Sequence, residues 1–279
     1  MLLEISVTLT AGVAVGFALG LTGSGGSLFA IPLLIYVVGL DMASAVPISL
    51  FVVGITALIG AFSAYHKKLL LIRPTVIFGI AGILSAPIGL KLGSITPENY
   101  RMLGFAILAL FMAARMGWQS LNDQSNKIVR ADLVLEGQSG ICRYSPEGKI
   151  GFTVPCAIAL ILAGALTGTM SGFFGVGGGF LIVPALMFVI RMNMPYAVGS
   201  SLAIIAMIGI SGGALNGFPI LIENIAALGF GVGSLFGMFL GRALASRLAG
   251  PLLQQVFTLA LFSTSIFMLF NYLGEAHAI

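Results

Sequence analysis

GALTGTMSGFFGVGGGFLIVPAL, at residues 164–186, decides the fold of this chain, because its pattern occurs once more as GVAVGFALGLTGSGGSLFAIPLL at residues 12–34. A shift of 152 positions aligns the copies without a gap and pairs Gly12/Gly164, Gly16/Gly168, Gly20/Gly172, Gly23/Gly175, Gly25/Gly177, Gly26/Gly178 and Pro32/Pro184. Beyond the glycine motif, the same shift pairs Ala45/Ala197, Val46/Val198, Ser49/Ser201, Leu50/Leu202 and Gly60/Gly212. Unrelated apolar runs match at many offsets, so one shared offset indicates a tandem duplication.

The composition places the chain in a membrane. Apolar residues make up 58% of the 279 residues, and charged residues only 8%. Several uncharged stretches exceed the roughly 18 residues that indicate a transmembrane helix. These features exclude a soluble globular protein and predict a multi-pass protein of the cell membrane, in a bacterium the cytoplasmic membrane. The N-terminal segment lacks a basic region and a cleavage site, so we interpret it as the first membrane segment rather than a signal peptide.

The charged residues and cysteines argue against several partners. The net charge is +4, but the basic residues are scattered without interleaved aromatic residues, so we expect no nucleic-acid partner. Cys142 and Cys156 are separated by 13 residues, with no second pair and no nearby histidine. This spacing fits neither a metal site nor a disulfide framework, so we interpret both cysteines as structurally incidental.

The first glycine motif predicts a break inside an apolar stretch. Residues 3–40 are almost uncharged after Glu4, and one helix of that length would run about 55 Å against a hydrocarbon core of about 30 Å. Glycines tolerate the conformations that end a helix, so we expect a helix to about Leu21, a turn at residues 23–27, and a short helix over residues 28–40 with Pro32 near its first turn. Three further segments are expected at residues 44–65, 74–91 and 98–118.

The second half repeats this order after a polar stretch. We expect a helix at 152–173, a turn at 175–179, a short helix at 180–191, and segments at 196–216, 220–242 and 251–273. The predicted organisation is a first membrane repeat over residues 1–118, a cytoplasmic linker over 119–150 and a second repeat over 151–279. The linker is too short for an independent domain, and its sequence around residues 145–148 is compatible with a small hairpin.

The basic residues predict the orientation in the membrane. A cytoplasmic loop at Lys67, Lys68 and Arg73 puts 11 of the 13 lysines and arginines inside and leaves only Lys91 and Arg101 outside. Both termini then lie outside and the linker lies inside. The duplicate of the basic loop, at residues 216–224, carries no positive charge, as expected on the opposite face. The predicted fold class is therefore an all-α polytopic membrane protein of two inverted repeats, each a glycine-broken helical hairpin plus three transmembrane helices.

Inverted repeats commonly place a binding site near the membrane midplane, built from broken helices. Irregular backbone at that depth must face protein or a water-filled cavity, and the short helices direct their N-terminal amides toward it. Such ends suit a small anion. The predicted substrate-binding residues are Gly23, Ser24, Gly25, Gly26 and Ser27 in the first turn, Gly175, Gly177, Gly178 and Gly179 in the second, and the hydroxyl-bearing Ser49, Ser200 and Ser201 on the helices that follow.

Packing is the competing explanation for these glycines. We assign it to the glycines spaced by four, which are Gly12, Gly16, Gly20, Gly164, Gly168 and Gly172. For the turn glycines, packing and binding both remain open. A dinucleotide fingerprint is excluded because no strand surrounds the turn and no acidic residue follows at the required distance.

Enzyme chemistry finds no support in the residues. The two histidines, His66 and His277, fit neither a zinc-protease motif nor a membrane-embedded Ser-His pair. Asp41, Glu98 and Glu223 all lie near predicted membrane boundaries, where a solvated or topological role is more common than a proton relay. We therefore expect no enzymatic activity, no cofactor and no bound metal.

The paired motifs GLTGSGGSLFAIPLL with ASAVPISL, and GFFGVGGGFLIVPAL with PYAVGSSL, resemble the sulfite exporter TauE/SafE family of membrane permeases. The resemblance extends over essentially the whole chain, including the polar linker. It implies transport of small sulfur oxyanions or organosulfur anions such as sulfite and sulfonates. The first copy departs from the family pattern at Ser27, where a third glycine is common, and at Ile48, where a hydroxyl residue is frequent, so the two half-sites are chemically unequal.

The sequence thus predicts a secondary transporter that moves small anions across the cytoplasmic membrane by alternating access. Two alternatives are an anion channel and a non-transporting membrane scaffold. The expected partners are a small anionic substrate and the lipid bilayer. Substrate identity, direction, coupling ion and oligomeric state are left open, as is whether the glycine hairpins are re-entrant or fully spanning.

Overall fold

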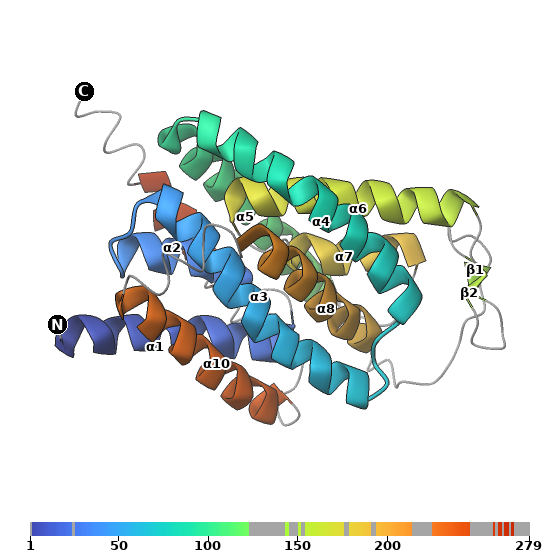
Figure 1. Ribbon diagram of the computed structural model, residues 1–279, viewed down its shortest axis with the longest axis horizontal. Coiled ribbons are helices and arrows are strands. Elements are labelled where there is room, and N and C mark those ends of the chain that lie inside the picture. Colours follow the sequence, from blue (N-terminus) through green and yellow to red (C-terminus); the bar gives the residue numbers. More distant parts are fainter. Residues whose placement is uncertain are drawn as a thin grey trace.

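The computed structural model describes residues 2–23, 26–122, 143–144, 150–151, 154–175, 179–190, 194–213 and 225–245, and positions 259, 262–263, 265–267 and 269–270. Helices make up almost all of this part (Figure 1). The elements are α1 Leu2–Thr22, α2 Ser27–Tyr36, α3 Met42–His66, α4 Ile72–Ile95, α5 Glu98–Asn122, β1 Arg143–Tyr144, β2 Ile150–Gly151, α6 Val154–Phe174, α7 Gly179–Ile190, α8 Met194–Gly213 and α10 Ile225–Ala245. The membrane-protein class and the helical fold predicted from sequence are confirmed.

The element order follows the duplication. A long helix and a short helix open each half, as α1 with α2 and as α6 with α7. The predicted start of the short helix was right to within one residue, because α2 begins at Ser27, and Pro32 lies inside the helix. The predicted end at residue 40 was wrong, because α2 ends at Tyr36. Gly39 has a φ of 77°, and this left-handed conformation turns the chain away from the helix before Leu40.

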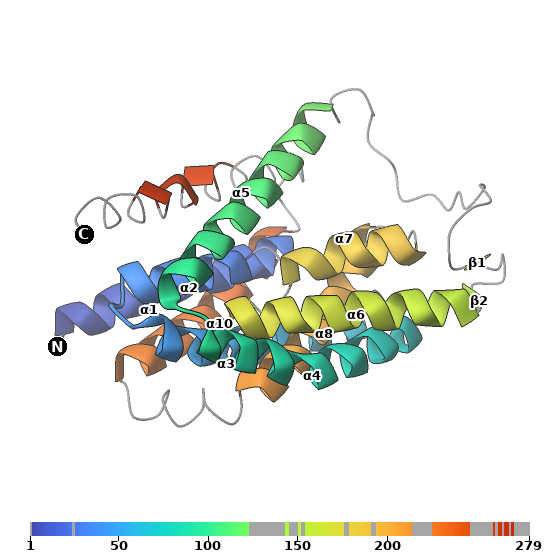
Figure 2. The same cartoon turned by 90° about the horizontal axis from the view of Figure 1, so that it is seen from above.

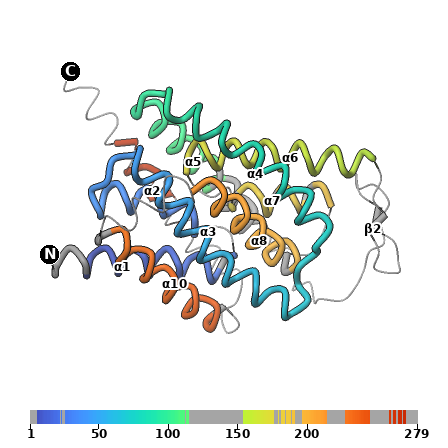
Figure 3. Tube along the Cα trace, in the orientation of Figure 1, coloured from blue at the N-terminus to red at the C-terminus, as the bar shows by residue number. Residues whose placement is uncertain are grey.

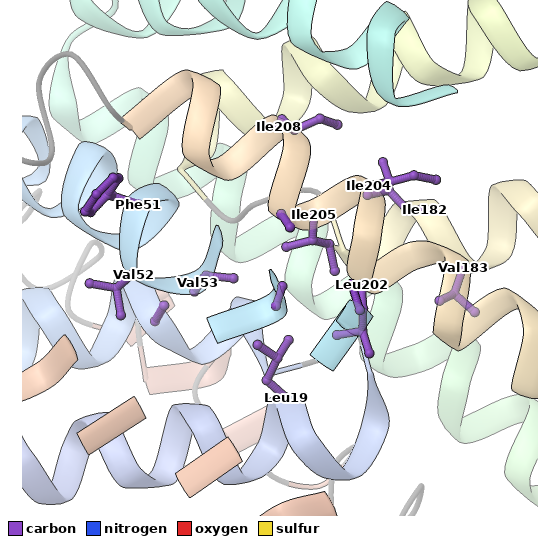
Figure 4. Close-up of a cluster of buried hydrophobic side chains, with 14 of the residues drawn as sticks. Leu19, Phe51, Val52, Val53, Ile182, Val183, Leu202, Ile204, Ile205 and Ile208 are labelled. Carbon is purple, nitrogen blue, oxygen red and sulfur yellow. The ribbon is translucent and has the colours of Figure 1, made fainter. Parts of the chain in front are cut away.

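Helices α3 and α8 form the antiparallel centre of the bundle. Gly54, midway along α3, approaches the backbone of Gly209 and Ile210 near the end of α8. Gly199, near the start of α8, approaches Ala64 near the end of α3. Contacts that run in opposite directions along the two helices establish the antiparallel pairing, which Figure 1 also shows. Buried side chains from α1, α3, α7 and α8 gather beside this pair (Figure 4).

Two outer helix pairs flank this centre, and each joins helices from different halves. Helix α1 packs along α10, and α6 packs along α4 (Figure 3). Glycines permit the approach: a side chain at Gly12, Gly16 or Gly20 would overlap α10 backbone carbonyls, and one at Gly164, Gly168 or Gly172 would overlap those of α4. The close-packing role predicted for these six glycines is therefore confirmed.

The outer faces are apolar. Helix α4 exposes a stripe of large side chains every fourth residue, at Ile80, Leu84, Ile88 and Leu92. Its glycines face the bundle, where Gly89 approaches α6 and Gly79 approaches Met207 of α8. Five described helices are long and apolar enough to span a membrane: Met42–His66, Ile72–Ile95, Val154–Phe174, Tyr196–Gly213 and Ala227–Leu244. Small residues inside and large apolar residues outside fit a helix bundle surrounded by lipid.

Helix α5 diverges from the bundle along its length (Figure 2). It is followed by the polar stretch, of which the structure describes only β1 and β2. These strands pair antiparallel, with Arg143 opposite Gly151 and Tyr144 opposite Ile150, so the hairpin expected around residues 145–148 is confirmed by its flanks. The domain boundaries at 118/119 and 150/151 remain predictions.

The interpretation of Cys156 as structurally incidental was wrong. Cys156, fully buried in the first turn of α6, is disulfide-bonded, whereas Cys142 lies outside the described residues. Pairing of β1 with β2 folds the chain back immediately before α6.

Candidate functional site

Two equivalent glycines end the long first helix of each half. Gly23 follows α1 with a φ of 72°, and Gly175 follows α6 with a φ of 73°. Each donates its N–H to the carbonyl oxygen four residues earlier, Leu19 or Ser171, at 2.8 Å. Glycine is favoured here because a side chain disfavours the left-handed conformation. The breaks predicted from sequence therefore begin at the expected residues.

Each glycine turn is held by the other half of the chain. Ser49 of α3 hydrogen-bonds to the carbonyl oxygen of Gly175, and Ser201 of α8 lies 3.4 Å from the carbonyl oxygen of Gly23. The flanking valines behave in the same way, because Gly175 packs against Val46 and Gly23 packs against Val198. All of these pairs exchange under the 152-residue shift, so the two turns have equivalent surroundings.

The hydroxyl protons of Ser49 and Ser201 already have acceptors. Ser49 and Ser201 also lie 2.8 Å from the carbonyl oxygens three residues earlier in their helices, and Ser200 accepts the N–H of Leu71 at 3.2 Å. A hydroxyl has only one proton to donate. Donation from Ser49 or Ser201 to an anion therefore requires that the hydroxyl first release a backbone carbonyl.

The remaining predicted residues lie at the starts of the short helices. Gly26 is buried before α2, Ser27 is fully buried in its first turn, and Gly179 is the buried first residue of α7. A Cβ at Gly26 would lie 2.6 Å from the Cα of Leu19, so this glycine is needed for packing inside its own hairpin. Ser24, Gly25, Gly177 and Gly178 lie outside the described residues.

The structure does not bring the two glycine turns together, contrary to the prediction of one binding site near the membrane midplane that both turns form. Gly175 contacts Val46 near the start of α3. Gly23 contacts Val198, and the adjacent Gly199 packs on Ala64 near the end of α3. Val46 and Ala64 are about 27 Å apart along the helix. The reason is that α1 and α6 run most of the length of the bundle before they break, so each turn lies toward an opposite end.

Two polar residues beside the second turn were missed by the sequence analysis. Arg101 of α5 is only 7% exposed, and its Nη2 donates to the carbonyl oxygen of Phe173 at 3.1 Å, which caps the end of α6. Ser171 is 1% exposed and lies one turn before Gly175. A signal existed for both. Arg101 was one of two basic residues that violated the charge distribution, and Ser171 is paired by the duplication with the apolar Leu19.

No group of three His, Cys, Asp or Glu side chains that could hold a metal ion occurs in the described part of the chain. Among the described residues, the polar groups beside the turns are hydroxyls, backbone amides and carbonyls, and the guanidinium of Arg101. These groups can bind an anion and orient it, but they form no nucleophile-base pair. The absence of cofactors and enzymatic activity remains a prediction.

Comparison with known proteins agrees with this architecture. The family described as "Sulfite exporter TauE/SafE" matches residues 8–268. A "Probable membrane transporter protein" of Xylella fastidiosa is 33% identical over 271 residues, which cover 96% of each chain. A protein of the same description from Haemophilus influenzae is 28% identical over 277 residues, with 95% of this chain and 97% of the relative covered.

"Probable membrane transporter protein YdhB" of Bacillus subtilis is 24% identical over 262 residues, which cover 91% of this chain and 96% of the relative. No solved structure matches the chain significantly. The long family match, the full-length relatives and the lipid-facing helices lead to one conclusion: the chain is a multi-pass membrane transporter that belongs to the sulfite exporter TauE/SafE family.

Proposed function

We propose that the protein is a secondary transporter of small anions, with sulfite and sulfonates as the first candidate substrates, that works by alternating access. The observation that supports this proposal best is the reciprocal contact of each glycine turn with the other half, through Ser49 to Gly175 and through Ser201 to Gly23. These contacts lie toward opposite ends of the central pair. The family description names sulfite, which supports a sulfur oxyanion.

The proposed mechanism uses the two contacts as alternating gates. The antiparallel equivalents α3 and α8 carry Ser49 and Ser201, so we infer that the repeats are inverted about an axis in the membrane plane. Movement of one half against the other would break the Ser49–Gly175 contact while Ser201–Gly23 holds, and the reverse movement would exchange them. In this conformation Ser201 lies 3.4 Å from the carbonyl oxygen of Gly23, near the limit of a hydrogen bond, so the Ser201–Gly23 contact is the weaker of the two.

Transport in proteoliposomes tests this proposal. We expect saturable sulfite flux that is accelerated by sulfite on the opposite side and is inhibited by other small anions but not by neutral or cationic analogues. A channel would give flux without trans-acceleration, and a scaffold would give none. Ser201→Ala should lower the flux by the equivalent of about 1 kcal/mol, the worth of one hydrogen bond. Gly178→Val does not separate binding from packing, because the duplication pairs Gly178 with Gly26. Gly26→Val is unsuitable because it would overlap Leu19.

The membrane orientation is a separate prediction. In a variant without Cys142 and Cys156, a reporter cysteine at Ser125 should be protected from an impermeant maleimide in intact cells, whereas one at Ala276 should react. The physical reason is that 11 of the 13 basic residues then lie inside. The disulfide at Cys156 favours the reverse orientation, because disulfides persist in oxidising compartments and the cytoplasm is reducing. Labelling of Ser125→Cys from outside would therefore reverse the orientation.

A further inference from the structure

The first turn of α5 is bonded to both helices that meet at the second glycine turn. Glu98 accepts the N–H of the first residue of α3 at 3.1 Å, and Nη2 of Arg101 donates to the carbonyl oxygen of Phe173 in α6 at 3.1 Å. These two helices also form the contact of Ser49 with Gly175, which we call the second gate. One turn of α5 therefore holds both sides of this gate.

Both hydrogen bonds satisfy backbone groups that a helix leaves unpaired at its ends. Asp41, the N-cap of α3, makes no side-chain capping hydrogen bond, so the carboxylate of Glu98 supplies the acceptor for Met42. At the end of α6 the guanidinium of α5 donates to Phe173 instead, beside Gly93 of α4, where a Cβ would lie 3.3 Å from the same Nη2. An ionised partner makes each bond roughly twice as strong as a neutral one.

The two bonds differ in the parts of the chain that they join. The bond of Glu98 lies within the first half and fastens α5 to α3. The bond of Arg101 crosses to Phe173 in the second half, as the contact of Ser49 with Gly175 also does. Because α5 is fastened to α3, a movement that separates α3 from the end of α6 also breaks the bond of Arg101.

The sequence supplies no such pair for the other gate, the contact of Ser201 with Gly23, which we call the first gate. The segment that corresponds to α5 in the second half, expected at residues 251–273, contains no charged residue. Arg242 donates to the carbonyl oxygen of Gly60 at 2.8 Å and so joins α10 to α3, whereas the first gate joins α8 to α1. The first gate is also the weaker contact, at 3.4 Å.

The bond of Arg101 is able to release. Within the described part of the chain, its Nε and the Oγ of Ser171 are the two buried side-chain atoms that have no hydrogen-bond partner. An unpaired buried donor is unfavourable, and water that enters when α6 moves away would satisfy the Nε. This cost offsets part of the bond to Phe173, so the contact favours closure without preventing opening.

We propose that Glu98 and Arg101 are positioning residues that form a clasp on the second gate, so that the resting transporter keeps this gate closed and opens the first gate more readily. The inference rests on the proposed alternating gates and specifies which of the two conformations is favoured in the absence of substrate. A difference of a few kcal/mol between two conformations is sufficient for one of them to dominate.

Cysteine reactivity tests the clasp without knowledge of the substrate. Val46 packs against Gly175 at the second gate, and its equivalent Val198 packs at the first gate. In purified protein, Arg101→Met should make Val46→Cys react with a maleimide about tenfold faster, the effect of one lost charged hydrogen bond, and should not accelerate Val198→Cys. Arg101→Lys keeps a donor and should stay near the parental rate. The chain without an introduced cysteine gives the background rate.

Glu98→Ala should also accelerate labelling of Val46→Cys, whereas Glu98→Gln keeps an acceptor oxygen and should stay near the parental rate. Arg242→Met is the matched control, because it removes an arginine that is also bonded to a backbone carbonyl of α3 but does not join the helices of the second gate. Its labelling rate at Val46→Cys should equal that of the parent.

Equal acceleration by Arg101→Met and Arg242→Met, or none by Arg101→Met, would overturn the clasp, and saturable sulfite flux in the parent would then leave the proposed function standing. A failure of the proposed function is recognised separately, since labelling does not depend on transport. A parent without saturable anion flux contradicts the transporter, and the clasp as a device of transport, whatever the labelling rates.

Discussion

Gly16→Ala should leave almost no folded protein in the membrane, although it adds a single methyl group. The new Cβ would overlap the carbonyl oxygen of Ser234, and neighbouring Gly12 and Gly20 approach α10 carbonyls in the same way. Backbone atoms of α10 cannot rotate aside as a side chain can. The helices must therefore separate, and their other contacts are lost together. We expect destabilisation of about 3 kcal/mol or more.

The measurement is the yield of monodisperse protein after detergent extraction, together with its melting temperature. Gly168→Ala should fail in the same way, because the duplication places this residue in the equivalent contact with α4. Gly212→Ala is the matched control: it is also a buried glycine within a membrane helix, but the nearest atom to its added Cβ is 3.6 Å away, an ordinary contact. Parental yield and melting temperature for Gly16→Ala would contradict the close-packed α1–α10 pair.

Gly23→Ala and Gly175→Ala should both destabilise the protein strongly, but only the first should be rescued by a second substitution. Each places a side chain on a left-handed residue, at a cost of about 1–2 kcal/mol. At Gly23 the added Cβ would also overlap Cγ1 of Val198, a side-chain atom that Val198→Ala removes. At Gly175 it would lie 2.8 Å from the Cα of Val46, which no truncation can remove.

Melting temperatures of the four single variants and two double variants test this difference. In Gly23→Ala with Val198→Ala, we expect recovery to within the cost of the left-handed conformation. In Gly175→Ala with Val46→Ala, most of the destabilisation should persist. Equal rescue at both turns would mean that the Val46 backbone does not restrict the second turn. Gly23 and Gly175 would then be restricted in the same way, by valine side chains alone.

The sequence was sufficient for the features that repeat. The 152-residue shift located both glycine turns, and the spacing of Gly12, Gly16 and Gly20 indicated a packing face. It could not tell which helix that face would meet, because the partner contributes backbone carbonyls, which every residue type supplies. For the same reason, nothing in the sequence indicated that α1 packs against α10 or that α6 packs against α4.

The position of the candidate site was harder to predict than its residues. The expectation of one midplane site placed both turns at the same depth, but helix length decides where a turn lies, and α1 and α6 each have 21 residues before the break. Ser171 and Arg101 were missed because a lone serine or arginine has no motif. Their importance depends on burial and on the lack of a partner, and both become visible only when the helices are packed together.

Because each outer helix pair joins the two halves of the chain, the fold has a consequence for biosynthesis. Gly12 and the residue it meets, Phe230, are 218 positions apart, so α1 enters the membrane long before α10 has been translated. Until then its glycine face has only lipid or a temporary partner beside it. The first half on its own can complete neither outer pair, since α4 also waits for α6. Assembly therefore finishes only near the end of synthesis, and a truncated chain exposes unfilled glycine faces that quality-control proteases can recognise.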